Sequence, residues 1–588
     1  MTTSSDQLKD TLQQEFPLDL STPRLLEISS ELTAAFHDGL HNSTAAMLPS
    51  HIYTLPTGTE QGKYIAADLG GSTLRVALVQ LAGDKSRSLI ISDTETPPMT
   101  ILEMKTWGGS QIEHLKTLTG DDFFDWIARR IEEIVEVAYK RFGLTDLRLG
   151  LSWSFPIEST SLDSGKVQGM GKGFVVADSL LGTDLKTHFT NAFSRLGLKI
   201  SLDAIVNDSL ATLLSHAYTA PATRTALILG TGTNASVSLP LSMLPSEKLA
   251  QTHLSRPLGA QEVLVNTELS MFGKGIYPVT KWDDALDAAM PRPGFQPLEY
   301  LIGGRYVGEI ARRVVVDLEK ERGLFGSKPL LWNDPYSLKT EILANIEVCP
   351  DDKFPNSYKE IHPSLDDAPL SFEDAMALKM ISHHVSSRAA NYCAIALHAL
   401  VKFREHESVS LPGQKQNIVP IGFVGSVMEK YPGLLERTQA VLDRLTGWSP
   451  GDVETQRILL EFAPESAIFG AAVAVAAAYS KPSTPPTASN SVRTSNSLPD
   501  NSSNTTDTPP PQPSPNFFVK RFKSLSGAKK TNSIKKLKKI SLPPPSNKVA
   551  PPKDANNDFS KESHPAPSIL TSINGFFSQY LFHKVLKK

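Results

Sequence analysis

Two copies of one pattern, a strand followed by a glycine turn and a second strand, constrain this 588-residue chain more than any other feature. The first copy reads IAADLGGSTLRVALVQL over residues 65–81, and the second reads TALILGTGTNASVSL over residues 225–239. Glycine adopts the backbone conformations of tight turns, and such turns leave N–H groups free to bind phosphate oxygens. The repetition predicts two related lobes that hold a nucleotide between them.

The residues of these turns suit a phosphate chain. The hydroxyls of Ser72 and Thr73 and the charge of Arg75 can receive phosphate oxygens, and Asp68 can hold a magnesium ion through water. A glycine hairpin is more often only a turn, so the first copy alone is a weak signal. Neither a P-loop motif nor a dinucleotide-binding G-x-G-x-x-G occurs. The candidate nucleotide-binding residues of the two turns are Asp68, Gly70, Gly71, Ser72, Thr73, Arg75, Gly230, Thr231, Gly232 and Thr233.

Around the second turn the chain carries carboxylates, amides, a serine and a lysine. Asn207 and Asp208 end an apolar strand just before a helical stretch, where such a pair usually only caps the helix. A hexose exposes several hydroxyls, and its pocket needs groups that both accept and donate hydrogen bonds. The candidate sugar-binding residues are Ser154, Lys172, Asn207, Asp208, Asn234, Glu268 and Glu299.

Composition excludes several other classes of protein. The formal net charge is only -3, so the molecule as a whole has no electrostatic attraction to nucleic acid or membrane. Its two cysteines, Cys349 and Cys393, lie far apart without C-x-x-C spacing, so neither a disulfide framework nor a zinc site is implied. The N-terminus lacks an apolar run of signal-peptide length, and no run of 18 or more apolar residues occurs along the chain. We therefore expect a cytoplasmic protein.

Strand-like and helical segments alternate over most of the chain, which predicts an α/β fold. The expected strands cover residues 64–68, 74–81, 147–153, 204–206 and 225–229, and the expected helices cover 122–142, 209–217, 304–320, 372–403 and 432–445. The expected divisions are a leader over residues 1–20, a small-lobe region over 21–206, a large-lobe region over 207–480, a linker over 481–565 and a terminal segment over 566–588.

The last two divisions differ from the rest in composition. Residues 481–565 are rich in Pro, Ser, Thr and Asn, and we expect them to be disordered. A basic run over residues 520–539 is either a solvated linker, a nuclear import signal or a contact for an acidic surface. Residues 566–588 form an amphipathic segment that either binds a membrane interface, such as the mitochondrial surface, or docks on protein.

Taken together, the motifs resemble those of the eukaryotic hexokinase and glucokinase family. The resemblance covers roughly residues 20 to 480 and rests on the segments IAADLGGSTLRV, LGLSWSFP, GKGF, VNDSLATLL, LGTGTNA, NTE, TKWDDALD and PLEYLIGGRYVGEIARRVVVDL. It implies an actin-like fold of two lobes, each a mixed sheet flanked by helices, that closes on glucose. It also implies transfer of the γ-phosphoryl group of ATP, bound with Mg²⁺, to the 6-hydroxyl of the sugar.

The resemblance assigns roles to individual residues. It implies that Asp208 is the catalytic base that accepts the proton of the attacking hydroxyl, and that Lys172 and Arg75 offset negative charge. Through the segment IGFVGSVMEKYP it adds Gly425 and Ser426 to the nucleotide-binding residues. No residue is implied as a direct metal ligand.

The sequence departs from the family mainly on the nucleotide side. Val424 stands where the family has an aspartate, Gly171 replaces a threonine near the sugar, and bulky Ile468 and Phe469 occupy glycine-rich positions expected to approach the adenine nucleotide. Two hypotheses follow from this imbalance. The chain is either a working hexokinase with a weakened nucleotide site, or a non-catalytic hexose-binding regulator of carbon metabolism.

Overall fold

The computed structural model describes residues 4–83, 97–170, 172–175, 180–252, 256–322, 332–350, 371–405 and 418–479. Residues 1–487 form one compact unit, which contains all of these segments. The predictions for the linker, its basic run and the terminal amphipathic segment lie outside the described residues. No helix within the described segments is long and apolar enough to cross a bilayer.

Two mixed sheets of matching topology form the framework. The first sheet has the order β4 (Met99–Gly108), β3 (Thr73–Ala82), β2 (Gln61–Leu69), β5 (Leu147–Trp153) and β8 (Ile200–Val206). The second has the order β1 (Leu48–Pro49), β11 (Glu262–Asn266), β10 (Thr233–Pro240), β9 (Thr225–Leu229), β12 (Ile418–Val424) and β13 (Arg457–Phe462). In each sheet an antiparallel three-stranded meander is followed by two parallel strands, so β2, β3 and β4 correspond to β9, β10 and β11.

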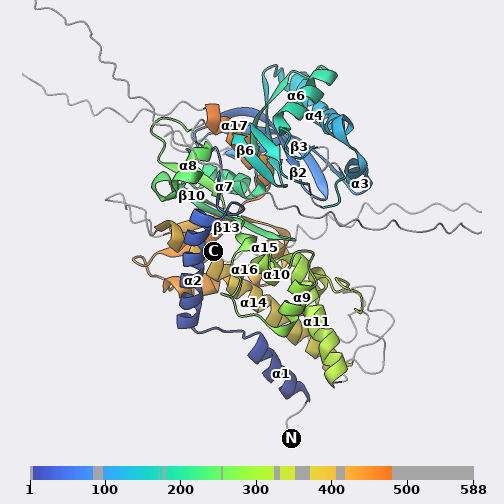
Figure 1. Cartoon of the computed structure of the whole chain (residues 1–588), viewed down its shortest axis with the longest axis vertical. Helices are drawn as coiled ribbons and strands as arrows, with labels where there is room; N and C mark the ends of the chain where they lie inside the picture. Colours follow the sequence, from blue (N-terminus) through green and yellow to red (C-terminus); the bar gives the residue numbers. More distant parts are fainter. Residues whose placement is uncertain are drawn as a thin grey trace, which may run out of the picture. The chain divides into compact units, whose positions relative to one another are not determined.

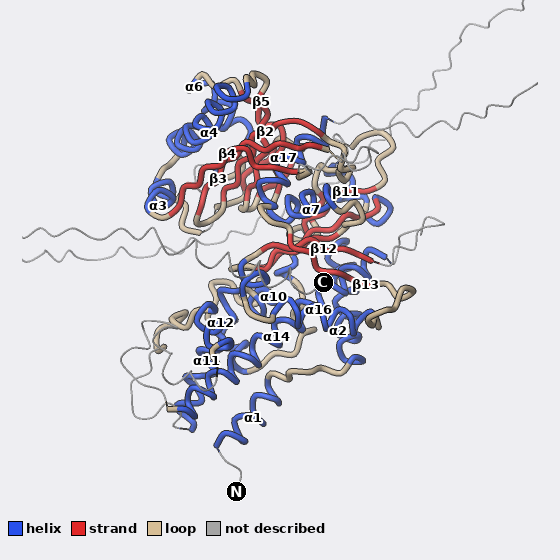
Figure 2. Tube along the Cα trace, turned by 180° about the vertical axis from the view of Figure 1, so that it is seen from behind, coloured by secondary structure: helices blue, strands red, loops and turns tan. Residues whose placement is uncertain are grey.

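Helices cover both faces of each sheet. One face of the first sheet packs against α3 (Ser110–Thr117), α4 (Gly120–Phe142) and α6 (Leu185–Leu196). Helices α7 (Asp208–Thr219) and α17 (Ser466–Tyr479) lie between the two sheets. They share one hydrophobic core with both sheets, which includes Ala66 of the first and Ala226 of the second. Figure 2 shows α7 between β2 and β3 on one side and β12 on the other.

The outer face of the second sheet packs against a larger helical layer, which includes α2 (Thr22–Asn42), α11 (Gly304–Arg322), α14 (Phe372–Glu405) and α16 (Leu434–Thr446). Helices α11 and α14 lie side by side in this layer (Figure 1). The remaining elements are α1 (Ser4–Glu15), β6 (Ile157–Ser161), β7 (Ser164–Val167), η1 (Leu241–Met243), α8 (Ser246–Thr252), η3 (Leu269–Met271), α9 (Lys281–Ala288), α10 (Pro297–Ile302), α12 (Thr340–Val348) and α15 (Ser426–Lys430).

Glycines set how closely α17 approaches its neighbours. A Cβ atom at Gly470 would lie 1.9 Å from the carbonyl oxygen of Ala211 in α7, and one at Gly150 in β5 would lie 2.0 Å from the carbonyl oxygen of Ala471. Real Cβ atoms essentially never come so close to another heavy atom. The small residues of α17 therefore let one helix pack directly on the backbone of both a strand and a helix.

The strands and helices expected from the sequence are all present. Each of the five expected strands lies within β2, β3, β5, β8 or β9, and each expected helix overlaps α4, α7, α11, α14 or α16. The fold is the predicted α/β arrangement with two mixed sheets flanked by helices. The segment set apart as a leader contributes to the core, because Leu8, Leu12 and Phe16 are buried and Phe16 stacks on Trp282 with ring centroids 5.6 Å apart.

Candidate active site

The start of helix α7 carries the candidate catalytic base. Asn207 caps the helix, and its Oδ1 accepts hydrogen bonds from the backbone N–H and the hydroxyl of Ser209, at 2.9 and 2.7 Å. Asp208 is the first residue of the helix, and its Oδ1 accepts a second bond from the Ser209 N–H, at 2.8 Å. The capping interpretation of this pair is therefore confirmed.

Asn234 and Glu268 are joined to each other through Asn266. The side-chain amide of Asn234 donates to Oδ1 of Asn266 at 3.0 Å, and the amide of Asn266 donates to Oε1 of Glu268 at 2.7 Å. Leu269 also donates its backbone N–H to Oδ1 of Asn234, at 3.2 Å. Glu268 has a left-handed backbone, with φ of 51°. This chain of hydrogen bonds fixes Glu268 to strands β10 and β11. Asn266 is a positioning residue that the sequence analysis missed.

Glu299 connects the sugar-binding candidates to the second glycine turn. It lies in α10, and its Oε2 accepts a hydrogen bond from the backbone N–H of Thr233, at 3.0 Å. The side chains of Asp208, Glu268 and Glu299 are all partly buried. Glu299 is thus bonded to Thr233 of the second turn, and Glu268 is linked through Asn266 to Asn234, the next residue.

The pKa values of these three groups are linked by their proximity. Burial raises the pKa of Asp208, and nearby Asp68 raises it further, whereas Lys172 lowers it. Burial also raises the pKa of Glu268, and the charges of Asp208 and Glu299 add to that effect. The pKa of Glu299 is raised by burial and lowered in part by Lys172. The effect of Asp208 and Glu299 on the pKa of Glu268 indicates that the three carboxylates lie near one another.

Lys172 and Ser154 complete this cluster. The ammonium group of Lys172 donates to the backbone oxygen of Ser154 at 3.1 Å and lies 5.1 Å from the centre of the Phe155 ring. A hydrogen bond from the Ser154 side chain contributes to lowering the pKa of Asp208. Lys172 is exposed and has a φ of 63°. The seven sugar-binding candidates, namely Ser154, Lys172, Asn207, Asp208, Asn234, Glu268 and Glu299, therefore lie in one connected region.

Arg75 was expected to bind phosphate oxygens at the first turn, but in the structure it is paired with two carboxylates. Its Nε and Nη2 atoms donate to Oδ2 of Asp68, at 3.1 and 2.8 Å, and its Nη1 donates to Glu465 at 2.7 Å. This bidentate contact orients the Asp68 carboxylate. Only Oδ2 of Asp68 takes part, and Asp68 is buried. At the tip of this turn, a Cβ at Gly71 would collide with the side chain of Lys172.

The second turn packs against two other glycine-containing turns. Gly304 and Arg305 donate their backbone N–H groups to the oxygens of Gly230 and Thr231, at 2.8 and 2.9 Å. A Cβ at Gly425, whose φ is 127°, would lie 2.4 Å from the backbone of Leu229. Gly425 and Ser426, which the resemblance assigns to nucleotide binding, thus lie beside Gly230.

Thr340 extends this assembly. Its hydroxyl donates to the oxygen of Gly304 at 2.6 Å and accepts from the N–H of Gly308 at 2.9 Å. The sequence analysis did not single out Gly304, Arg305 and Thr340 as residues that pack on the second turn. The paired glycines before helix α11 were the signal that could have identified the first two.

Ile468 lies in helix α17, at a position expected from the sequence to approach the nucleotide. Its side chain is fully buried in the core between the two sheets, so it does not face the turns. Phe469 is partly buried and packs against the same core. Helix α17 begins at Ser466, whose hydroxyl forms a hydrogen bond with that of Thr212 in α7, at 3.0 Å. Val424 ends β12, opposite Ile228.

No cluster of three or more metal-binding side chains occurs among the described residues.

Comparison with known proteins is consistent with the geometry. Hexokinase family models match residues 10–218 and 224–477. Hexokinase-2 of Oryza sativa subsp. japonica is 30% identical over 471 residues, which cover 78% of this chain and 88% of that protein. The chain belongs to the hexokinase family.

Other hexokinases match over the same extent. Hexokinase-2 of Candida albicans is 28% identical over 479 residues, which cover 79% of this chain and 90% of that protein. The structure of a Schistosoma mansoni hexokinase complexed with glucose matches with a TM-score of 0.64 and 26% identity. That match covers 81% of this chain and all of the other. The predicted family and the two-lobed hexokinase fold are thus confirmed.

Proposed function

We propose that this hexokinase-family protein binds a hexose such as glucose and transfers the γ-phosphoryl group of ATP to its 6-hydroxyl. The single observation that supports the proposal best is the convergence of Asp208, Glu268 and Glu299 with Lys172 beside the second glycine turn. Carboxylates and amides around one cleft suit the hydroxyls of a sugar ring. ATP and Mg²⁺ are the expected cosubstrate and cofactor, as is general in this family.

Asp208 is the proposed base. Phosphoryl transfer passes through a loose transition state, so the protein mainly positions the reactants and neutralises charge. The partly buried carboxylate of Asp208 accepts the proton of the sugar hydroxyl as that oxygen bonds to phosphorus. Lys172 is exposed and free to reach from the Ser154 carbonyl toward the phosphoryl group. Ser154, Asn207, Asn234, Glu268 and Glu299 hold the sugar hydroxyls.

The two glycine turns are the proposed phosphate-binding elements. Backbone N–H groups at the tips of the two turns, those of Gly71, Ser72, Thr231 and Gly232, surround the phosphate chain together with Ser426. The N–H groups of Gly70, Gly230 and Thr233 are already donated to Thr73, Gly232 and Glu299. Asp68, held by Arg75, would hold the magnesium ion through water, and the ion would neutralise charge on the phosphate chain. Closure of the lobes on the sugar excludes water that would otherwise hydrolyse ATP.

A coupled assay for hexose 6-phosphate tests this proposal. We expect turnover by the wild-type protein and a loss of at least about 100-fold in kcat for Asp208→Ala, which is the usual contribution of a general base. Glucose-dependent thermal stabilisation without any turnover would instead support the non-catalytic regulator. The side chain of Ile468 is buried in the core, so its bulk does not by itself favour this alternative.

We further propose that the core acts in the cytoplasm and that residues 481–588 direct it to an anionic surface. The support is the composition of the chain alone, with a basic run at residues 520–539 and a terminal amphipathic segment. A fluorescent reporter fused to residues 481–588 tests this location. Accumulation at the mitochondrial surface or in the nucleus would support it, and a uniformly diffuse signal would contradict it.

A further inference from the structure

A cavity opens between helices α9 and α11. Its volume is about 410 Å³, which lies within the range of small-molecule sites. Three cations and three apolar side chains line it, namely Lys281, Arg312, Arg313, Trp282, Ala285 and Val316. None of these is a candidate sugar-binding or nucleotide-binding residue, and Arg313 lies eight residues beyond Arg305, about 12 Å along the same helix. The cavity is therefore separate from the candidate active site.

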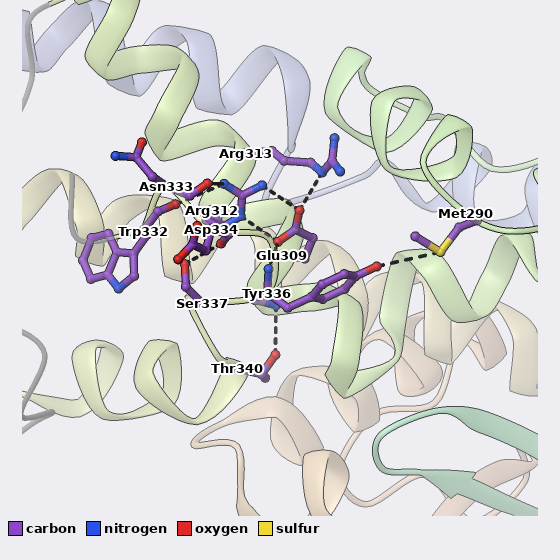
Figure 3. Close-up of polar contacts among 11 residues, drawn as sticks. Met290, Glu309, Arg312, Arg313, Trp332, Asn333, Asp334, Tyr336, Ser337 and Thr340 are labelled. Atoms are coloured by element: carbon purple, nitrogen blue, oxygen red, sulfur yellow. Dashed lines mark hydrogen bonds and ion pairs between the residues drawn. The ribbon is translucent and has the colours of Figure 1, made fainter. Parts of the chain in front are cut away.

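Two of the cations share a single buried carboxylate, that of Glu309 (Figure 3). Arg312 donates to it through Nε and Nη2, at 2.7 and 2.8 Å. Arg313 donates through Nε at 2.9 Å, and the backbone N–H of Tyr336 donates at 2.7 Å. A carboxylate has about four lone-pair positions, and these four bonds fill them. Glu309 therefore has no acceptor left for the other nitrogens of Arg313.

The outer end of the Arg313 guanidinium is available to a ligand. Within the segments that the structure describes, its Nη1 and Nη2 atoms form neither a hydrogen bond nor an ion pair. In Arg312, by contrast, Nη1 donates to the backbone oxygens of Trp332 and Asn333, at 3.0 and 3.3 Å. Figure 3 shows the end of Arg313 directed away from Glu309, and its side chain is 20% exposed. Two such parallel N–H groups are the geometry that binds a phosphate group in bidentate fashion.

The charges around the cavity do not cancel. Oδ2 of Asp317, the other carboxylate in the lining, is paired with Lys281 at 2.6 Å and accepts a hydrogen bond from the indole of Trp282 at 3.0 Å. Burial alone would raise the pKa of Glu309, but its bonds with the arginines and with the backbone lower that pKa, so Glu309 is ionised. Three cations thus face two carboxylates, which leaves one positive charge, and it lies at Arg313.

We propose that this cavity binds a small phosphomonoester, with its phosphate on the Nη atoms of Arg313 and its organic part against Ala285 and Val316. A phosphomonoester carries about two negative charges at neutral pH and three strong acceptor oxygens. These match the paired N–H groups and the unbalanced positive charge. The apolar side chains beside Arg313 favour an organic ester over the bare ion.

Calorimetric titration with phenyl phosphate tests the proposal. The full-length protein is first saturated with glucose and with the magnesium complex of a non-hydrolysable ATP analogue, so that the candidate active site is occupied. The variants are Arg313→Ala and Ala285→Glu, and the control is Arg141→Ala, which alters an exposed arginine paired with Glu103. Ala285 is exposed, so Ala285→Glu adds a repelling carboxylate without removing a bond to Glu309. It keeps the test decisive if Arg313→Ala destabilises the fold.

We expect the wild type and the control to bind phenyl phosphate equally. Each variant binds it at least about tenfold more weakly, a difference of about 1.4 kcal/mol. Equal affinity of the wild type and both variants overturns the site and leaves the proposed function intact, as does a wild type that binds no phenyl phosphate. Benzoate that binds as tightly as phenyl phosphate overturns the preference for phosphate. Inorganic phosphate that binds as tightly overturns the contact with the organic part.

Discussion

The carboxylate of Glu299 occupies the space where a side chain at position 232 would begin: a Cβ atom built on Gly232 lies 2.4 Å from Oε2 of Glu299. The same oxygen accepts the hydrogen bond from the Thr233 N–H. Gly232 therefore acts in two ways, as part of the second turn and as the gap through which a sugar-binding carboxylate reaches that turn. One glycine couples the sugar side of the site to the phosphate side.

Gly232→Ala is expected to raise KM for glucose about tenfold. The added methyl group displaces the end of the flexible Glu299 side chain, and the loss of a charge-assisted hydrogen bond is worth about 1.5–3 kcal/mol. The melting temperature changes little, because only a side-chain terminus has to move. Steady-state kinetics with glucose and MgATP varied separately checks this expectation. A variant with normal glucose affinity would show that Glu299 does not hold the sugar.

Asp208→Asn is expected to stabilise the fold while it removes turnover. Burial raises the pKa of Asp208, so the folded protein binds this proton more tightly than the unfolded chain does. Stability therefore falls as pH rises from the ordinary carboxyl range through the raised pKa. The amide removes that buried charge, and we expect a melting temperature about 1 °C higher at pH 7. Thermal unfolding at several pH values measures this, and a lower melting temperature at pH 7 would contradict it.

Gly470→Ala is expected to destabilise the protein by about 3 kcal/mol, at the upper end of the usual cost of overpacking. The new Cβ would meet the backbone of Ala211, which cannot move aside as a side chain can. Gly169→Ala is the matched control, since a Cβ there would have no neighbour within 4 Å. Denaturant unfolding of the two variants gives the comparison. Equal stabilities would mean that α7 and α17 are farther apart than described.

Glu347 is expected to account for part of the stability that is lost in acid. Burial alone would raise its pKa, but hydrogen bonds and charge from His383, Arg437 and Tyr431 lower the pKa of Glu347 to about 2. Its contribution is complete above its ordinary pKa of 4.5 and is lost as pH falls through about 2.

The matching variant is Glu347→Gln. Because one pKa unit is worth about 1.4 kcal/mol, we expect it to be about 3 kcal/mol less stable at neutral pH. Its stability should also change less between pH 4.5 and 2 than that of the wild type. Denaturant titrations at both pH values measure the difference. Parallel acid profiles of the two proteins would show that this cluster does not contribute.

The amino-acid sequence by itself determined the strands, the long helices and the two glycine turns. Alternation, helical periodicity and glycine placement are local, so a pattern such as that before Asp208 reveals a strand, a cap and a helix at once. Local patterns also identified candidate functional residues, including Glu268 and Glu299.

Only the tertiary structure decided how these residues meet. Arg75 is paired with Glu465, 390 positions away, and Ile468 points into the core, although its neighbours in sequence suggested a place at the nucleotide. Arg305 and Tyr336 become partners through packing that no local pattern encodes. The physical reason is that the rotation of a helix and the pairing of distant charges depend on which surfaces are buried together. That choice is made by the whole core and not by any short segment.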